Sequence, residues 1–307
     1  MKQLVILSGK GGTGKTSVAA AFAHLAAQSG LAGKVVLADA DVDAANLELV
    51  LQPNLREEQD FKGGKVAVID PETCAACGDC QAVCRFDAIH PHPQPLSQRE
   101  RGEYWVDPIA CDGCAACVYQ CPTQSISMRE RIAGKFYFSE SRYGPLYHAR
   151  LFPGQENSGK LVTLVKQRAR LQALNEGREL VIVDGPPGIG CPVIAAVSGA
   201  NLALIVAEPT VAGVHDMRRV LQTVQHFGVR AMVVINKADV YPAGTEEIES
   251  FCRENGIETV GRIPFDLTVA SAMVAGEAVT AYRPEAAVSV AIRQVWERVL
   301  SSLLEDK

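Results

Sequence analysis

The sequence has few aromatic residues, no strong excess of one charge and no long apolar run. Aromatic residues make up 6% of the 307 residues, and the formal net charge is −5. Without a basic surplus or aromatic stacking surfaces, there is no reason to expect a nucleic acid partner. No apolar run approaches the ~18 residues that a membrane-spanning helix needs. We therefore expect a protein that neither binds nucleic acid nor crosses a membrane.

Two further absences bear on the compartment. Met1 is followed at once by an apolar segment, residues 3–7, which leaves no room for the basic start, apolar stretch and cleavage site of a signal peptide. Outside two cysteine runs only Cys191 and Cys252 remain, too few for a disulfide framework. Free thiols are typical of a reducing compartment, so we expect a cytoplasmic protein.

The sequence does contain two cysteine runs with identical spacing. Both read C-x2-C-x2-C-x3-C, the spacing of bacterial ferredoxins that bind 4Fe–4S clusters. The runs consist of Cys74, Cys77, Cys80 and Cys84, and of Cys111, Cys114, Cys117 and Cys121. Zinc sites use paired C-x2-C units instead, so iron is the favoured metal. The spacing therefore predicts two 4Fe–4S clusters.

In two-cluster ferredoxins the fourth cysteine of each run binds the other cluster. Carried over to this chain, that rule gives two ligand sets: Cys74, Cys77, Cys80 and Cys121 for cluster 1, and Cys84, Cys111, Cys114 and Cys117 for cluster 2. One departure is Arg85, which stands where proline usually follows the fourth cysteine, whereas Pro122 keeps the pattern. The Arg85 cation either raises a cluster potential or points to solvent, and we favour solvent.

A second motif lies at the start of the chain. Residues 9–16 read GKGGTGKT between an apolar strand, residues 3–7, and an alanine-rich helix, residues 16–28. This context is typical of a phosphate-binding loop, in which backbone N–H groups and a helix N-terminus bind phosphates. We expect ATP contacts from Gly11, Gly12, Thr13, Gly14, Lys15, Thr16 and Ser17. Lys15 should reach the β- and γ-phosphates, and the Thr16 hydroxyl should bind Mg²⁺.

Most of the remaining chain alternates between apolar runs and helical stretches. Near-continuous apolar runs are typical of parallel strands buried on both faces. The runs lie at residues 34–38, 180–183, 202–207 and 231–235, and the helical stretches at about 214–227, 245–255 and 267–276. The alternation predicts an α/β fold with a doubly wound, mostly parallel sheet.

The alternation breaks between residues 62 and 132, where cysteine, glycine, proline and polar residues dominate. We interpret residues 62–132 as an inserted small α+β ferredoxin-like domain held together by its clusters, since so short a piece has little apolar core. Residues 1–61 and 133–307 then form the P-loop domain. The proline-rich residues 90–102 are interpreted as a solvated loop, and His90 and His92 as loop residues rather than metal ligands.

Lys10 is an additional lysine that the ordinary phosphate-loop motif does not contain. With it, the loop resembles the deviant Walker motif of the MinD, ParA and nitrogenase iron protein class. In that class the equivalent lysine reaches the phosphates of the partner subunit in an ATP-bound dimer. The resemblance implies a homodimer, or a heterodimer of paralogues, that forms on ATP binding. Lys10 would then stabilise charge on the transferring phosphoryl group as an arginine finger does.

Acidic segments after two apolar runs extend this resemblance. Residues 39–46 resemble switch I, with Asp41 as the candidate to orient the attacking water and Asp39 and Asp43 acting through Mg²⁺ and its waters. Residues 184–188 resemble Walker B with switch II, with Asp184 near Mg²⁺ and the Gly188 N–H sensing the γ-phosphate. Each acid alone could be an ordinary helix cap. Their shared position after predicted strands favours a site.

On the base side, Asn236 and Lys237 resemble the adenine-contacting segment of the class, and residues 264–266, beginning at Pro264, resemble its second base-side loop. Cys191 lies in a region where the nitrogenase iron protein has a cluster ligand, but a second cysteine of that kind is not evident. We expect Cys191 not to bind a cluster and Cys252 to be a small core residue.

Nearly the whole chain resembles the MinD-superfamily P-loop ATPases that contain an inserted ferredoxin domain. Three functions remain open. ATP-gated electron transfer to an unknown redox partner is favoured. An iron–sulfur assembly carrier is disfavoured, because no C-x-x-C follows Cys121. A MinD-like positioning ATPase with redox-sensing clusters is the third, but residues 288–304 carry mixed charges and are expected to pack on the sheet rather than on a membrane.

Overall fold

The computed structural model describes residues 1–92, 104–155 and 158–305. The chain forms two compact units. The first, here the P-loop unit, comprises Met1–Gln59, Phe136–Arg150 and Ser158–Lys307, and the second, here the cysteine unit, comprises Asp60–Lys135 and Leu151–Asn157. In the described ranges no helix has the length and apolar character needed to cross a membrane.

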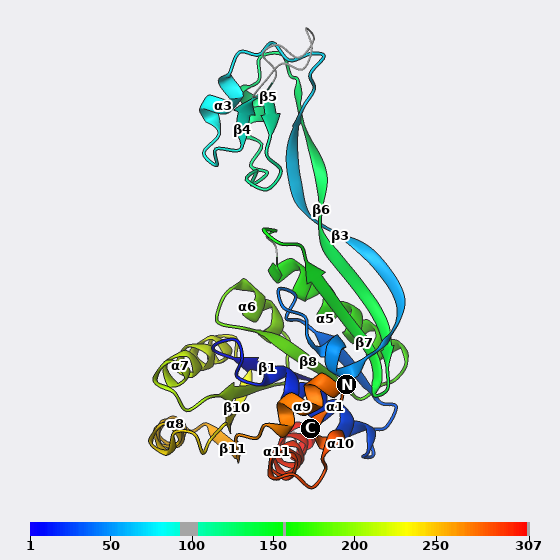
Figure 1. Ribbon diagram of the computed structural model, residues 1–307, viewed down its shortest axis with the longest axis vertical. Helices are drawn as coiled ribbons and strands as arrows, with labels where there is room; N and C mark the ends of the chain where they lie inside the picture. Colours follow the sequence, from blue (N-terminus) through cyan, green and yellow to red (C-terminus); the bar gives the residue numbers. More distant parts are fainter. Residues whose placement is uncertain (93–103, 156–157, 306–307) are drawn as a thin grey trace. The chain divides into compact units, whose positions relative to one another are not determined.

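The P-loop unit is built on a sheet of neighbouring parallel strands (Figure 1). The strand order is β11-β10-β9-β1-β8-β2-β7-β6-β3, and every recorded pairing from β11 to β7 is parallel. These parallel strands are β1 (Lys2–Ser8), β2 (Val35–Asp39), β7 (Gly144–Leu151), β8 (Leu180–Pro187), β9 (Leu202–Ala207), β10 (Arg230–Asn236) and β11 (Glu258–Ile263). The predicted mostly parallel α/β sheet is confirmed.

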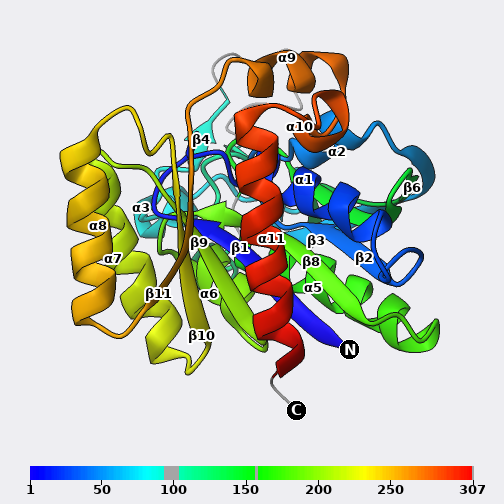
Figure 2. The ribbon, with the colours of Figure 1, turned by 90° about the horizontal axis from the view of Figure 1, so that it is seen from below.

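Helices cover both faces of this sheet (Figure 2). One layer holds α1 (Lys15–Ala27), α2 (Leu47–Leu51), α9 (Thr268–Ala275), α10 (Val279–Tyr282) and α11 (Ala287–Glu305), and the other holds α5 (Ser158–Asn175), α6 (Cys191–Val197), α7 (Val211–His226) and α8 (Pro242–Glu254). In α11, Trp296 is 3% exposed and its ring centroid lies 4.9 Å from that of Phe22. Trp296 shares a buried core with Leu4 of β1 and Val260 of β11, so the C-terminal helix packs on the sheet, as predicted.

Parallel strands place their carboxyl ends at one edge of a sheet, and loops at that edge form the ligand site of open α/β folds. The phosphate loop follows β1, Asp39 ends β2, Asp184 lies in β8 and Asn236 ends β10. The register pairs Asp39 with Asp184 across β2 and β8. The topology thus gathers residues that are more than 200 positions apart in sequence.

Two long strands, β3 (Asn54–Ile69) and β6 (Ile126–Ser141), were missed by the sequence analysis and contribute to both units. Most of β3 is exposed, so it has no apolar periodicity to reveal it. β3 begins three residues after α2 and ends five residues before Cys74, and β6 begins five residues after Cys121. The inserted unit is therefore wider than residues 62–132 and includes Leu151–Asn157.

The cysteine unit is an internal repeat, because Cys111 follows Cys74 by 37 residues and the backbone repeats at the same interval. Positive φ angles occur at Ala76, Gly78 and Asp87 and again at Gly113, Ala115 and Gln124. Short helices α3 (Asp79–Val83) and α4 (Ala116–Gln120) are related in the same way. Both cysteine runs thus have the same local fold.

A small two-stranded sheet completes this unit, with β4 (Ile89–Pro91) antiparallel to β5 (Tyr104–Val106). His90 therefore lies in a strand, where its ring centroid is 5.4 Å from that of Trp105 with the rings tilted, and the loop interpretation was wrong for this residue. His92 follows β4, and the rest of the expected loop from residue 93 lies outside the described residues.

Candidate functional site

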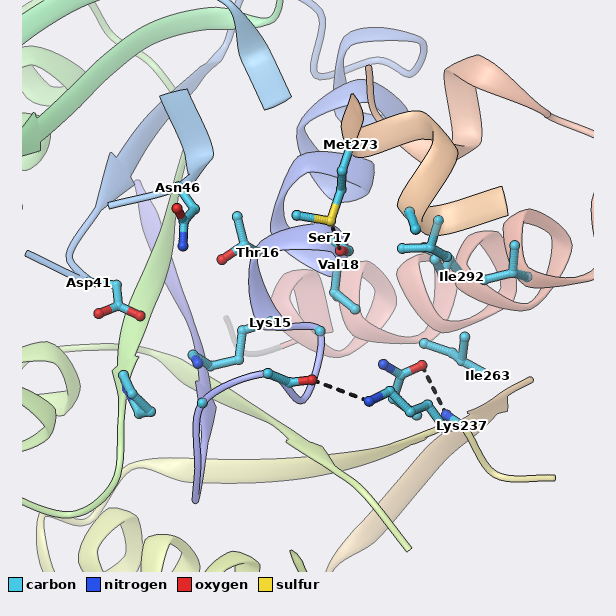
Figure 3. A pocket seen from close by; sticks show the side chains of 18 of the residues that line it. Lys15, Thr16, Ser17, Val18, Asp41, Asn46, Lys237, Ile263, Met273 and Ile292 are labelled. Carbon is cyan, nitrogen blue, oxygen red and sulfur yellow. Dashed lines mark hydrogen bonds between the residues drawn. The ribbon is translucent and has the colours of Figure 1, made fainter. Parts of the chain in front are cut away.

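The loops at the carboxyl edge of the sheet enclose a pocket of about 610 Å³ (Figure 3). Eleven of the predicted site residues line it: Gly11, Gly12, Gly14, Lys15, Thr16, Ser17, Asp41, Asp43, Asn236, Lys237 and Pro264. Five others, Lys10, Thr13, Asp39, Asp184 and Gly188, are not part of its lining. Lys15, Thr16 and Asp41 lie towards one end, and Ile263, Met273 and Ile292 towards the other.

The phosphate loop is shaped by Gly14 and held by Asn236. Gly14 precedes α1 with φ +95°, a left-handed conformation that favours glycine. The Asn236 side-chain amide donates to the Thr13 carbonyl at 2.7 Å, so β10 braces the loop. Lys15 is only 5% exposed at the start of α1, where backbone N–H groups and the helix dipole favour a bound phosphate.

The carboxylates of Asp184 and Asp41 lie beside this loop. Asp184 is 1% exposed, and neither of its carboxylate oxygens has a hydrogen-bond partner by distance and angle among the described residues. Burial raises the pKa of Asp184 to about 7 and that of Asp41 to about 6, in both cases against the charge of Lys15. Buried, unpartnered carboxylate oxygens fit a divalent cation such as Mg²⁺, whose ligands are oxygen atoms.

Asp39 and Asp43 differ from each other in their surroundings. Asp39 is fully buried and accepts backbone hydrogen bonds from Asp41 at 3.1 Å and Leu47 at 3.0 Å, so it holds the segment that leads into α2. Burial, and then the charge of Asp184, raise the pKa of Asp39. Asp43 is exposed at the pocket wall.

Lys10 forms an ion pair with Glu208, an acid that was not among the predicted site residues. Its ammonium lies 2.8 Å from Glu208 Oε2, and Glu208 Oε1 lies 2.9 Å from the Lys237 ammonium, which also donates to the Gly12 carbonyl. Although burial opposes it, the hydrogen bonds from Lys10 and Lys237 lower the pKa of Glu208. Glu208 thus joins lysines from the two sides of the phosphate loop.

The base end of the pocket is apolar and was only partly predicted. Phe265, Met273 and Ile292 line it beside Pro264. Asp239 accepts a hydrogen bond from the Phe265 N–H at 2.7 Å and so fixes this loop. The Gly188 N–H, expected to sense a phosphate, donates here to the Ser8 carbonyl at 2.9 Å.

The cysteines of the two runs surround two small cavities. Site 1 is lined by Cys74, Cys77, Cys80 and Cys121, together with Tyr104 and Thr123. Site 2 is lined by Cys84, Cys111, Cys114 and Cys117, together with Ala67 and Phe86. Each run thus contributes three cysteines to one cavity and its fourth cysteine to the other.

The chemistry of both sites fits an iron–sulfur cluster. All eight cysteines are free thiols, and the backbone N–H groups of Ala76 and Ala88 donate to the sulfurs of Cys74 and Cys84 at 3.5 and 3.4 Å. Across the described ranges, no three His, Cys, Asp or Glu side chains converge closely enough to hold a single metal ion. A 4Fe–4S cubane does not require side chains that converge on one ion, because each thiolate binds its own iron at a separate corner.

The other two cysteines lie in the P-loop unit. Cys252 is fully buried in α8, as expected of a small core residue. Cys191 begins α6, is exposed and lines a separate cavity with Lys160, Lys166 and Arg170. Lys166 is bonded there to the carbonyls of Ala195 and Ser198, both at 2.7 Å.

A chain of polar contacts connects α2 with the strands beyond it. Glu48 in α2 contacts His148 Nδ1 of β7 at 3.0 Å, and His148 Nε2 contacts the Ser139 hydroxyl of β6 at 2.9 Å. Arg150 of β7 donates to the other Glu48 oxygen at 2.6 Å. The hydrogen bond from His148 is the largest cause that lowers the pKa of Glu48.

The fold and the glycine loop define a P-loop nucleotide-binding protein of the MinD and ParA type. The chain belongs to the CobQ/CobB/MinD/ParA nucleotide binding domain family, whose pattern matches residues 4–279. Among solved structures, the MinC:MinD cell division protein complex of Aquifex aeolicus is similar with a TM-score of 0.58 and 19% identity, over 98% of this chain and 96% of that chain. At that identity the likeness concerns the fold.

Relatives identified by sequence match different parts of the chain. Uncharacterized protein MJ0578 of Methanocaldococcus jannaschii is 33% identical over 76% of this chain and 78% of its own length. Ferredoxin-1 of Rhodobacter capsulatus is 35% identical over 19% of this chain and 85% of its own. The cytosolic Fe-S cluster assembly factor NBP35 of Eremothecium gossypii is 25% identical over 39% of this chain and 41% of its own.

Proposed function

We propose that this protein is a Mg²⁺-dependent ATPase that dimerises on ATP, carries two 4Fe–4S clusters and couples ATP turnover to electron transfer with a redox partner. The observation that carries the proposal is the division of eight cysteines into two four-cysteine cavities, in a chain that also has a P-loop pocket. The exchange of Cys84 and Cys121 between runs is the ligand pattern of two-cluster ferredoxins.

We assign each proposed cofactor to a set of residues. The phosphate loop would bind ATP, and Thr16 and Asp184 would hold Mg²⁺, directly or through its waters. Sites 1 and 2 would each supply four thiolates to a cluster, whose chemistry is one-electron transfer. Asp41, at the phosphate end of the pocket, is placed to orient a water, and Lys15 to stabilise charge on the phosphates.

Lys10 supports a dimeric mechanism. It is absent from the lining of its own pocket, and its ammonium pairs with Glu208, so it would exchange this pair for phosphates held by a second subunit. That subunit is another copy of this chain or a paralogue. Two relatives from one organism, MJ0578 and MJ0579, are compatible with paralogue pairing.

The chain offers a direct route between the nucleotide and the cysteine runs. Asp39 holds the start of α2, and α2 is followed within three residues by β3, which leads to Cys74. Glu48 of α2 also contacts β7, and through His148 it reaches β6, which begins after Cys121. A shift of α2 on ATP binding would therefore act on both strands that lead to the cluster ligands.

Anaerobic reconstitution of the full chain tests the proposal. The wild type should hold about eight iron atoms per chain, as two clusters require, and hydrolyse ATP. Cys121→Ser should remove about half of the iron, and Cys191→Ser, the matched control outside both sites, should keep it. Full iron retention in Cys121→Ser, or half loss in Cys191→Ser, would contradict the ligand assignment.

A second candidate is an iron–sulfur carrier, favoured by the partial similarity to an assembly factor. Against it, the sequence after Cys121 has only Cys191 and Cys252, so it lacks a C-x-x-C for labile binding. Incubation with an apo-ferredoxin separates the two functions. Rapid ATP-stimulated loss of clusters to the acceptor would favour the carrier, and retention would favour electron transfer.

A further inference from the structure

We propose that Thr123 makes the two cluster sites unequal, so that site 1 takes up the first electron when the protein is reduced. This inference rests on the proposed function, because it requires clusters in both sites. It concerns the direction of electron flow within the cysteine unit, which the ligand spacing alone leaves undetermined.

Because of the internal repeat, the two sites have the same local fold, and their remaining differences can be compared directly. Cys80 and Cys117, which are related by the repeat, are both 7% exposed, and Cys77 and Cys114 are both exposed. The helices and positive-φ positions that shape the two loops are the same. Solvent exposure of the ligands, one determinant of cluster potential, is therefore matched between the sites.

The hydroxyl groups are not matched. The Thr123 hydroxyl lies 3.6 Å from the Cys121 sulfur and 2.6 Å from the Ser125 hydroxyl, and Tyr104 also lines site 1. The residues 37 positions away, on the site 2 side of the repeat, are all apolar: Phe86 for Thr123, Ala88 for Ser125 and Ala67 for Tyr104. Tyr104 and Thr123 thus line site 1, and Ser125 bonds to Thr123, whereas the three corresponding residues that line site 2 are apolar.

The direction of these hydrogen bonds follows from the chemistry of a metal-bound thiolate. Such a sulfur has no proton to give, so the Thr123 hydroxyl must donate to Cys121. The Ser125 hydroxyl can then donate to Thr123, and hydrogen bonds in a chain strengthen one another. Ser125 is 4% exposed, so water competes little at that end of the chain.

A donor to a ligating sulfur stabilises the more negative, reduced state and therefore raises the potential. Charged side chains do not reverse this difference. The charged side chains next to the ligands are all exposed: Asp79 at site 1, and Arg85, Asp87 and Asp112 at site 2. Solvent and salt screen these charges, whereas the Thr123 hydroxyl is in direct contact with a ligand. Site 1 is therefore expected to have the higher potential.

Anaerobic redox titration with dithionite, followed by EPR, tests the inference on the reconstituted full chain. The wild type should show two reduction steps. Thr123→Val removes the hydroxyl at nearly constant shape and should lower only the upper step, by at least a tenfold change in the reduction equilibrium, which is 59 mV for one electron. Thr123→Ser keeps a hydroxyl and should retain the wild-type potential. Thr73→Val is the matched control, because the Thr73 hydroxyl bonds to Asp70.

Each outcome decides the matter. Movement of the upper step alone in Thr123→Val, with Thr73→Val unchanged, supports the inference. An unchanged titration, a shift of the lower step, or an equal shift of both steps overturns it. Iron content separates this from failure of the proposed function, because a wild-type chain with fewer than about eight iron atoms per chain would refute the two-cluster protein itself.

Discussion

The P-loop unit and the cysteine unit are stabilised in different ways. The P-loop unit has parallel strands buried on both faces, and Leu4 to Leu7 of β1 are fully buried. Around the cysteines, the buried cluster consists of Ala67, Cys80, Ile89, Cys117 and Ile126, so two of its five members are proposed cluster ligands. The comparison indicates that the first unit folds on apolar burial, whereas the second depends on what its cysteines bind.

Removal of iron should therefore have the largest effect, and it should affect the two units differently. Chelation should unfold the cysteine unit, because metal binding there supplies folding free energy. ADP affinity of the P-loop unit should change less than about twofold, since its pocket lies wholly within that unit. Limited proteolysis and calorimetric ADP titration measure the two effects. A chelated protein that stays resistant to protease between residues 60 and 135 would show that the apolar cluster suffices.

Lys10→Ala should affect the other unit: ATP hydrolysis should be lost and both clusters should stay bound. Because a trans-acting cation stabilises transition-state charge, ATP turnover should fall at least ~100-fold, and ATP-dependent dimerisation should be lost. Iron content should not change. Lys34→Ala is the control, because Lys34 forms an exposed pair with Glu179. Unchanged turnover in Lys10→Ala would remove the argument for a partner-directed lysine.

Glu208→Gln should have a smaller effect, and it should strengthen ADP binding. The Glu208 carboxylate competes with phosphate for Lys10 and Lys237, so its removal should tighten ADP binding by about 3- to 10-fold. Glu249→Gln, which breaks the Arg262 pair elsewhere, is the control. Weaker ADP binding in Glu208→Gln would mean that this acid supports the loop rather than restraining its lysines.

The smallest effect concerns pH. Without Mg²⁺, the folded pKa of Asp184 is about 7 against a usual 3.8, so the native state binds more protons between these values. Stability from this group is therefore lost as pH rises from about 4 to 7. Asp184→Asn should melt at the wild-type temperature near pH 4 and roughly 10 °C higher above pH 7, at ~1.4 kcal/mol per pKa unit and ~2–4 °C per kcal/mol. If the difference in melting temperature between Asp184→Asn and the wild type did not vary with pH, the titration of Asp184 would be excluded as its cause.

The sequence predicted the parts of the fold that have strong local signals. Continuous apolar runs at residues 202–207 and 231–235 correspond to β9 and β10 because such strands are buried on both faces. The mostly exposed strand β3 and the mostly half-buried or buried strand β6 are not continuous apolar runs, since long-range pairing helps to hold them. His90 was misjudged for the same reason, because its strand is defined by its pairing with Trp105.

The site was predictable where one short motif carries the chemistry. The glycine loop places its own residues around the phosphate end of the pocket. Glu208 was not predicted, because its partners Lys10 and Lys237 are distant in sequence and meet only through strand order. The second role of Asp39, as acceptor of two backbone hydrogen bonds, was hidden for a similar reason, since it needs the fold of the segment before α2.

The central claim is that the nucleotide state of one unit alters the clusters of the other. The most direct test is an anaerobic EPR redox titration of the reconstituted protein with and without Mg-ATP, using Glu48→Ala to cut the contact from α2 to His148. The proposed coupling predicts a nucleotide-dependent shift of cluster potential in the wild type and a smaller shift in Glu48→Ala. Identical titrations with and without Mg-ATP, with both clusters bound, would contradict it.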